Sequence, residues 1–313
     1  MKSRFMRIIL SVLILSLALQ TIPLPALARS EANQHQTEIE VPTILSENRL
    51  SSLPDDGDDQ PYPIDDDFDC TTVTDVLPIE CEALVDLYQS TNGDNWRFKG
   101  NWLQDTKVAE WYGVTVDSGV VTQLQLYSNY MNGSIPTKLG NLSNLRVLRL
   151  NGNQLSGSIP STLGNLPNLQ TFSLSHNILN GSIPAELGSL SNLLELHLNS
   201  NKLNGNIPST LGNLSKLEVL SLGDNQLTGS IPTELGNLSG LWALHLNSNK
   251  LTGSIPLSFV NLAELVYFNY FETNLCEPAT KEFLDWKETV SDWNGTGVIC
   301  GEQKLICLPL IFR

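Results

Sequence analysis

The sequence predicts an α/β solenoid, a stack of 24-residue turns with a parallel sheet along its inner, concave side. Three observations predict it: leucines recur every 24 residues, asparagine recurs in a column of its own, and a Gly-x-Ile-Pro block returns in each period. The leucine columns include those that start at Leu145, Leu148 and Leu150. The asparagine column comprises Asn129, Asn153, Asn177, Asn201, Asn225 and Asn249.

Each period carries the pattern of a strand followed by a turn. The alternation at Leu148 and Leu150 predicts a short strand with one buried face, and seven such strands, the last degenerate, can pair side by side. The asparagine can satisfy backbone groups that the turn buries, while glycine and proline set the torsions of the turn. Because each period needs neighbours on both sides to bury its leucines, one period alone should not fold.

The consensus LxxLxLxxNxLxGxIPxxLGxL resembles the leucine-rich repeat, in the 24-residue form typical of plant receptor ectodomains and their bacterial look-alikes. The resemblance covers residues 78 to 300 or so. It implies a right-handed superhelix with helical caps at both ends. Residues 121–264 would form six repeats, and residues 265–303 a degenerate repeat and the C-terminal cap.

A stack of repeats exposes an apolar end at each terminus and therefore needs caps. Residues 70–120 fit the first cap, with a helix expected to begin at Pro78 and to end at Asn92-Gly93. For the second cap, we expect a helix that begins at Pro278. The side chains expected to cover the ends of the stack are Leu84, Leu87, Tyr88, Trp96, Trp102 and Trp111 in the first cap, and Phe283, Trp286 and Val290 in the second.

The five cysteines lie only near the two ends of the chain's repeat array, as expected for local disulfides in an exported protein. The first cap is similar to the N-terminal cap of leucine-rich-repeat proteins, but it has Val108 and Val116 where that cap usually carries a disulfide. A pair in front of the helix would replace it. The expected disulfides are Cys70–Cys81 and Cys276–Cys300, which leaves Cys307 without a partner.

The N-terminus indicates export. Basic residues precede an apolar run, and small residues follow at Ala26-Leu27-Ala28, which predicts a secretory signal peptide over residues 1–28. A membrane anchor is the alternative, but the apolar core of about 12 residues is shorter than the roughly 20 that span a bilayer. No later stretch is long and apolar enough to cross a membrane. We therefore expect a secreted or cell-surface protein, with a bacterial source favoured.

Residues 29–69 show no apolar periodicity and contain a run of aspartates among prolines, which predicts an acidic disordered linker. Calcium binding is the alternative, although the spacing lacks the order of a helix-loop-helix calcium loop. Residues 304–313 fit no repeat column and are either a sorting tail, resembling short Leu-Pro-Leu tails of exported bacterial proteins, or a last strand of the cap. No Leu-Pro-x-Thr-Gly anchoring motif is present, so surface attachment stays open.

Charge excludes one class of partner. The net charge is −15, and removing the signal peptide takes away three basic and no acidic side chains, which leaves −18. Nucleic acid would be repelled, because binding it requires lysine and arginine to neutralise phosphates.

Function should reside on the concave face, where side chains vary while the scaffold repeats. One column there reads Gln125, Arg149, Ser173, His197, Ser221, His245 and Asn269. Aromatic side chains and arginine are enriched in binding hot spots, and seven strands define a strip roughly 30 Å long that suits a peptide, a protein loop or a glycan. The candidate ligand-binding residues are Tyr127, Arg149, His176, His197, an exposed Trp242, His245, Tyr267 and Phe271.

These residues favour a non-catalytic recognition or adhesion module, acting as a monomer and without a cofactor. A shared metal site is disfavoured, since His197 and His245 are two strands apart, about 10 Å. A milder expectation is that protonating the histidines alters binding below about pH 6.5. A structural spacer or surface-layer element without a specific ligand is the second class. An enzyme is the third, although no phosphate-binding loop, HExxH zinc pair or Gly-x-Ser-x-Gly elbow is present.

Overall fold

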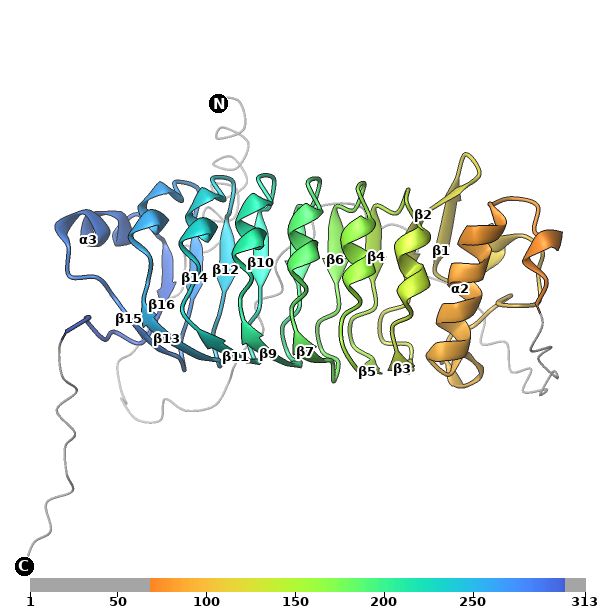
Figure 1. The fold of residues 1–313 in the computed structure, drawn as a ribbon, viewed down its shortest axis with the longest axis horizontal. Helices are drawn as coiled ribbons and strands as arrows, with labels where there is room; N and C mark the ends of the chain where they lie inside the picture. The colour runs from red at the N-terminus through yellow and green to blue at the C-terminus, as the bar shows by residue number, and fades with distance from the viewer. Residues whose placement is uncertain (1–67, 302–313) are drawn as a thin grey trace, which may run out of the picture. The chain divides into compact units, whose positions relative to one another are not determined.

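The computed structural model describes residues 68–301, which form the predicted α/β solenoid (Figure 1). The predicted signal peptide, the linker up to residue 67, Cys307 and the tail over residues 304–313 lie outside the described residues. Successive turns of the chain stack along one axis, with the N-terminal cap at one end and the C-terminal cap at the other.

The concave sheet has nine strands in the order β1-β2-β4-β6-β8-β10-β12-β14-β16. All pairs are parallel except β1 with β2, which form an antiparallel ribbon in the N-terminal cap. The caps thus add β1 and β16 to the seven strands that the repeats predict. The strands are β1 Val114–Asp117, β2 Val120–Gln125, β4 Val147–Arg149, β6 Thr171–Ser173, β8 Glu195–His197, β10 Val219–Ser221, β12 Ala243–His245, β14 Tyr267–Asn269 and β16 Asp292–Asn294.

A second side of the solenoid carries further short parallel strands that were not expected from the sequence. They form a two-stranded sheet, β3-β5, and a five-stranded sheet, β15-β13-β11-β9-β7. Five of these seven strands end within the first two residues of a Gly-x-Ile-Pro block, and these blocks were interpreted as turns because of their glycines. The strands are β3 Asn132–Ser134, β5 Gln154–Ser156, β7 Asn180–Ser182, β9 Lys202–Asn206, β11 Gln226–Gly229, β13 Lys250–Ser254 and β15 Asn274–Cys276.

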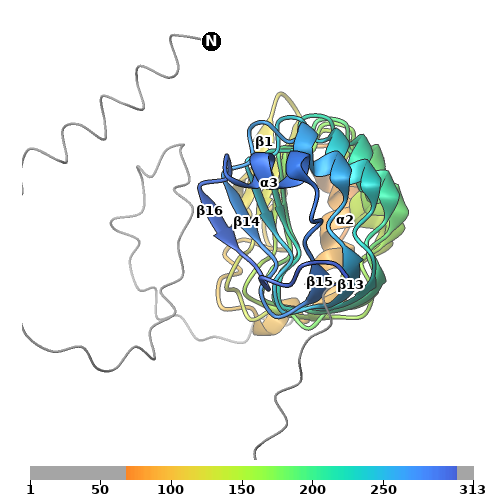
Figure 2. The same cartoon turned by 90° about the vertical axis from the view of Figure 1, so that its left-hand side faces the viewer.

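The remaining side consists of one short 3-10 helix per turn, stacked in a row, as Figure 2 shows in a view along the solenoid. A glycine inside each central helix allows the next turn to approach closely. A Cβ atom on Gly188, for example, would collide with the backbone carbonyl of Thr210. The helices are η4 Thr137–Asn141, η5 Ser161–Asn165, η6 Ala185–Ser189, η7 Ser209–Asn213, η8 Thr233–Asn237 and η9 Leu257–Asn261.

The core is one continuous column of leucines between these three sides. Leu148, Leu196 and Leu220 of three different turns are all completely buried, as is Phe172 in the same column. Burying such a side chain contributes about 2 kcal/mol, and each does so only when the next turn covers it. Stability is therefore shared between neighbouring turns.

The asparagine column joins each turn to the next. The side-chain amide of Asn177 donates to the carbonyl oxygens of Leu150 and Leu174, both at 3.0 Å. Its side-chain oxygen accepts a hydrogen bond from the backbone N–H of Leu155 at 2.9 Å. Asn201, Asn225 and Asn249 repeat this pattern one turn further each time. The structural role predicted for the asparagine column is therefore confirmed.

The N-terminal cap consists of α2 Pro78–Ser90, the 3-10 helices η1 Cys70–Thr72, η2 Gly93–Asn95 and η3 Val108–Glu110, and the β1–β2 ribbon. Its helix begins at the predicted proline, and Trp96, Trp102 and Trp111 are buried, with Trp102 edge-on to Trp96 and tilted against Trp111. Phe68 packs on Trp111, with ring centroids 5.4 Å apart, so the cap includes a residue that was assigned to the linker. The Cys70–Cys81 disulfide holds the chain in front of the helix.

The C-terminal cap differs in detail from the prediction. Its helix, α3 Lys281–Lys287, begins after Pro278, because Thr280 is the N-cap and its hydroxyl accepts a hydrogen bond from the Phe283 N–H at 3.4 Å. Val290 is buried but follows the helix. The Cys276–Cys300 disulfide joins β15 to the last described residues.

A buried charge network completes the C-terminal cap. Glu277 is 1% exposed, and its carboxylate accepts hydrogen bonds from Lys287 at 2.6 Å and from Tyr270 at 2.5 Å. The indole N–H of Trp293 donates to the same carboxylate at 3.3 Å. Among the described residues, no buried side-chain nitrogen or oxygen atom lacks a hydrogen-bond partner.

Candidate ligand-binding surface

The concave sheet aligns side chains from successive strands in straight columns. In-register pairing places Arg149 beside Ser173, Ser173 beside His197, and the column continues through Ser221, His245 and Asn269. Ser173 and Ser221 are 7% and 9% exposed. The larger side chains of this column therefore alternate with small, buried serines. A neighbouring column contains Thr171, Glu195, Val219, Ala243, Tyr267 and Asp292.

Charged side chains gather at the centre of this surface. On β8, the Nε2 atom of His197 lies 3.6 Å from the Oε2 atom of Glu195. The hydrogen bond with His197 lowers the pKa of the Glu195 carboxyl, burial opposes that shift, and the positive charge of Arg149 adds to it. All three side chains are half-buried. The centre therefore offers a carboxylate, an imidazole and a guanidinium to a ligand.

Aromatic side chains gather toward the C-terminal end of the same sheet. Trp242, just before β12, packs edge-on against Tyr267 of β14, with ring centroids 4.8 Å apart. Trp242 is half-buried, so the prediction of an exposed indole is wrong: the neighbouring tyrosine covers part of it. His245 lies in the adjacent column, where burial, and secondarily the charge of His197, lowers the pKa of its imidazole.

The other three predicted residues lie beyond the ends of the strands, along the rim of the sheet. Tyr127 follows β2 and is 45% exposed, while Phe271 follows β14 and is 50% exposed. His176 is also exposed and has a φ of 54°, in the left-handed region, because it occupies the tight turn after β6. The structure thus groups Arg149, His197, Trp242, His245 and Tyr267 on the sheet and separates the rim residues from them.

The sequence analysis missed an aromatic cluster at the N-terminal cap, which we call the cap patch. It adjoins Tyr127, and the cap residues Arg97, Phe98 and Tyr112 contribute to it together with Tyr130. The exposed fractions of Phe98 and Tyr130 are 42% and 56%. Arg97-Phe98 directly follows the Trp96 that was assigned to the cap core, and this proximity was the available signal.

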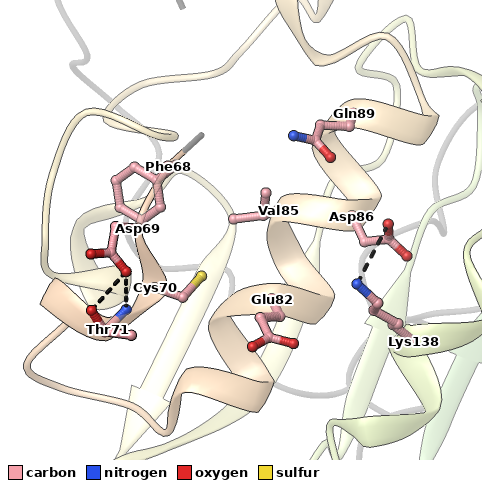
Figure 3. Close-up of a pocket in the computed structure, with 9 residues that line it drawn as sticks. All are labelled: Phe68, Asp69, Cys70, Thr71, Glu82, Val85, Asp86, Gln89 and Lys138. Carbon is pink, nitrogen blue, oxygen red and sulfur yellow. Dashed lines mark hydrogen bonds and ion pairs between the residues drawn. The ribbon is translucent and has the colours of Figure 1, made fainter. Parts of the chain in front are cut away.

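A small open depression lies elsewhere on the cap, beside α2, with a volume of about 220 Å³ (Figure 3). Its polar groups are largely engaged with one another. Asp69 accepts hydrogen bonds from the backbone N–H and the hydroxyl of Thr71, and Lys138 lies 4.0 Å from Asp86. The lining residues are Phe68, Asp69, Cys70, Thr71, Glu82, Val85, Asp86, Gln89 and Lys138. This depression belongs to the framework of the disulfide-linked cap.

The second side of the solenoid presents uncharged polar side chains in two regular columns, which we call the polar ladder. Both columns follow the 24-residue repeat and alternate with buried or small residues, so their side chains face outward. Strand pairing offsets the two columns, because it places Ser134 beside Ser156 and Ser182 beside Asn204, while Asn180 lies beside Lys202 and Thr228 beside Lys250. The polar ladder comprises Asn132, Ser156, Asn180, Asn204, Thr228 and Thr252 in one column, and Ser134, Ser158, Ser182, Asn206, Ser230 and Ser254 in the other.

Residues 68–301 show neither a candidate metal site nor a candidate membrane span. Within that part of the chain, no three histidine, cysteine or acidic side chains are placed to hold a metal ion. The described helices include none with the length and hydrophobicity to cross a membrane.

Comparisons with known proteins extend these findings. The leucine-rich repeat region family matches residues 120–263. A plant peptide hormone receptor, RGFR1 in complex with RGF2, is 38% identical, with a TM-score of 0.52 over 55% of this chain and 27% of that one. A plant ice-binding protein is 28% identical, with a TM-score of 0.59 over 67% of this chain and 68% of that one.

A third solved structure, Pollen Receptor Kinase 3, is 27% identical, with a TM-score of 0.52 over 71% of this chain and 99% of that one. The chain spans 27% to 32% of the length of the first three receptors that it matches. None of the curated protein sequences matches it.

Proposed function

Because the chain is a leucine-rich-repeat protein, we propose that its concave sheet binds an extended peptide segment of an extracellular partner. The observation that carries this proposal is that a charged pair and an aromatic pair lie on the same face of one sheet. The Glu195–His197 pair of β8 and the Trp242–Tyr267 pair near β12 are two strand spacings apart, about 10 Å. One extended peptide of a few residues can contact both.

The chemistry of the two clusters supports recognition. Trp242 and Tyr267 bring large rigid rings, and such side chains dominate binding energies because they bury much area at little entropic cost. The charged centre supplies both an acceptor, Glu195, and a donor, Arg149, which fix the direction and register of a bound peptide. The similar receptor RGFR1 is a peptide hormone receptor and was solved in complex with RGF2.

Export of the protein is part of the same proposal. Two disulfides staple the caps, and disulfides persist in oxidising compartments such as the extracellular space. A predicted signal peptide over residues 1–28 supplies the route. We propose that the solenoid acts outside the cell as a binding module, with no part in covalent chemistry.

A peptide library tests the proposal. Random 12-residue peptides displayed on phage are selected on the full-length protein, and the dissociation constants of the selected peptides are measured by calorimetry. Trp242→Ala and Tyr267→Ala should each weaken binding more than tenfold. Leu257→Ala is the matched control, because Leu257 is 49% exposed on η9, away from the concave sheet. Failure to select any peptide, or equal binding by all four proteins, contradicts the proposal.

The polar ladder favours a second candidate function, binding to ice. Small hydroxyl and amide groups pair across neighbouring strands about 4.8 Å apart, as Ser134 does with Ser156 and Ser182 with Asn204, while Lys202 and Lys250 pair with Asn180 and Thr228. Such a regular surface can order water, and the chain is similar to a plant ice-binding protein over two thirds of both chains.

Ice recrystallisation assays test this second function with the purified protein. The wild type should inhibit crystal growth, Thr228→Lys should reduce the inhibition, and Trp242→Ala should not. Unhindered crystal growth with the wild type eliminates ice binding. If peptide selection also fails, the predicted spacer or surface-layer role is the remaining proposal.

A further inference from the structure

The cap patch has the geometry of a preformed site. The guanidinium carbon of Arg97 lies 4.9 Å from the centre of the Phe98 ring and 6.0 Å from the centre of the Tyr130 ring. Phe98 in turn contacts Tyr112, with ring centroids 5.3 Å apart and planes at 30°. Burial raises the pKa of Tyr112, and the nearby Tyr127 phenol adds to that shift. Two aromatic rings thus flank one cation, and a third packs against one of them.

The backbone beneath the cap patch is held rigidly. Asn129, the first member of the asparagine column, has no preceding repeat to join and instead binds the cap segment. Its side-chain amide donates to the Phe98 carbonyl at 2.9 Å, and its side-chain oxygen accepts from the Phe98 N–H at 2.6 Å. The Arg97 N–H donates to the Asn129 carbonyl at 3.0 Å. The positions of Arg97 and Phe98 therefore cost little entropy to maintain when a ligand binds.

The backbone of Tyr130 adopts a left-handed conformation with a φ of 60°. A bulky residue rarely adopts it, and the equivalent residues of the next five repeats have ordinary torsions. Packing does not explain this conformation, because the Tyr130 side chain is 56% exposed. Backbone outliers of this kind concentrate at ligand clamps, where they hold a side chain in the binding geometry.

The charge of Arg97 and the net charge of the protein disfavour highly charged ligands at the cap patch. Arg97 would repel a cation, which aromatic rings otherwise attract. A polyanion would be repelled by the net charge of −15. Within residues 68–301, no carboxylate lies within 4.0 Å of the Arg97 guanidinium, and its side-chain N–H groups donate no hydrogen bond. The cap patch therefore offers apolar ring faces next to free hydrogen-bond donors, without a net attraction for highly charged ligands.

We propose that the cap patch binds a neutral hexopyranose glycan, a site separate from the peptide site proposed on the concave sheet. A pyranose ring has an apolar face that stacks on an exposed aromatic ring and hydroxyl groups that accept hydrogen bonds from a guanidinium. A proline-rich peptide, the other neutral ligand of aromatic surfaces, docks in a groove. The rings of Phe98, Tyr127 and Tyr130 are instead open to solvent.

Titration with three neutral hexasaccharides tests the site on the full-length protein. The probes are β-1,4-linked hexamers of glucose, N-acetylglucosamine and mannose, and calorimetry gives the dissociation constants. At least one hexamer should bind, and Tyr130→Ala and Arg97→Met should each weaken it at least tenfold. Phe271→Ala is the matched control, because it removes an equally exposed ring at the opposite end of the rim and should leave binding unchanged.

Tyr130→Gly separates loss of the ring from damage to the fold. Glycine adopts a φ of 60° without strain, so this variant should keep or raise the melting temperature while losing the glycan. The proposal is overturned if no hexamer binds, if Tyr130→Gly binds as tightly as the wild type, or if Phe271→Ala weakens binding as much. Tighter binding of decaproline or of polygalacturonate than of every neutral hexamer also overturns it. Peptide binding by the concave sheet is measured with other variants, so the two proposals fail independently.

Discussion

The hydrogen bonds of the asparagine column can be weighed by replacing Asn177 with alanine. The change removes an amide whose two N–H groups donate to the Leu150 and Leu174 carbonyls, and at 3.3 Å to the Ser175 carbonyl, and an oxygen that accepts from the Leu155 N–H. Counting one bond for each N–H of the side chain and one for its oxygen gives three bonds. Each bond contributes about 1 kcal/mol net, which gives about 3 kcal/mol. Asn177 is 7% exposed, so water does not reach the freed groups easily, and the total loss should approach 5 kcal/mol.

Urea unfolding followed by circular dichroism measures this loss. Asn180→Ala is the matched control, because Asn180 lies three residues further on, is exposed and makes no side-chain hydrogen bond within residues 68–301. It should change the free energy of unfolding by less than about 0.5 kcal/mol. A loss below about 1 kcal/mol for Asn177→Ala, or equal losses for both variants, would show that the column does not hold the turns together.

Three titratable groups give further predictions, each measured by thermal or urea unfolding at several pH values. Glu277→Gln should cost about 3 kcal/mol at pH 7, because Lys287 loses its buried partner. Burial alone would raise the pKa of Glu277, but the hydrogen bond from Lys287 and its other partners lower it. The stability that the ionised carboxylate contributes is therefore present at neutral pH and is lost as the pH falls through the lowered pKa. Below that pKa, the variant should be as stable as the wild type. Burial raises the pKa of Glu80 above its ordinary value of 4.5, so the stability that the protonated carboxyl contributes below pH 4.5 is lost as the pH rises through the raised pKa. Glu80→Gln should therefore gain stability relative to the wild type as the pH rises over that range. Burial lowers the pKa of His245 from 6.5, so stability present above that value is lost as the pH falls through the lowered pKa, and His245→Gln should lose less stability between pH 7 and pH 5.

The repeating part of the fold was predictable because its physical requirements recur. Leu148 and its equivalents must be buried in every turn, so the same residue type returns at a fixed spacing and identifies the concave strands. Asn153 and its equivalents meet the same backbone groups each time, so their column identifies the turn. The N-terminal helix was predictable for a local reason. Within a helix, proline fits well only in the first turn, so Pro78 indicates where the helix begins.

The second set of strands could not be distinguished from turns in the sequence. Gly205 of β9 and Gly229 of β11 have φ values of 76° and 77°, which indicate turns when taken alone. Their strands exist because the preceding turn supplies a parallel partner, β7 for β9 and β9 for β11, and this depends on the stacking of whole turns. The exposure of Trp242 was mispredicted for a similar reason, because the neighbour that covers it, Tyr267, is 25 residues away.

The candidate sites share one physical property, which is departure from the repeat. Every turn places a side chain where Trp242 and Tyr130 lie, and those positions are otherwise filled by residues such as Gln170 and Gln154. The core gains nothing from an aromatic ring at either position, because both face away from the leucines. Tyr130 even requires an unfavourable backbone torsion, with a φ of 60°. Side chains that the scaffold does not need, held in place by a scaffold that does not vary, are the best indication of where this solenoid contacts its ligands.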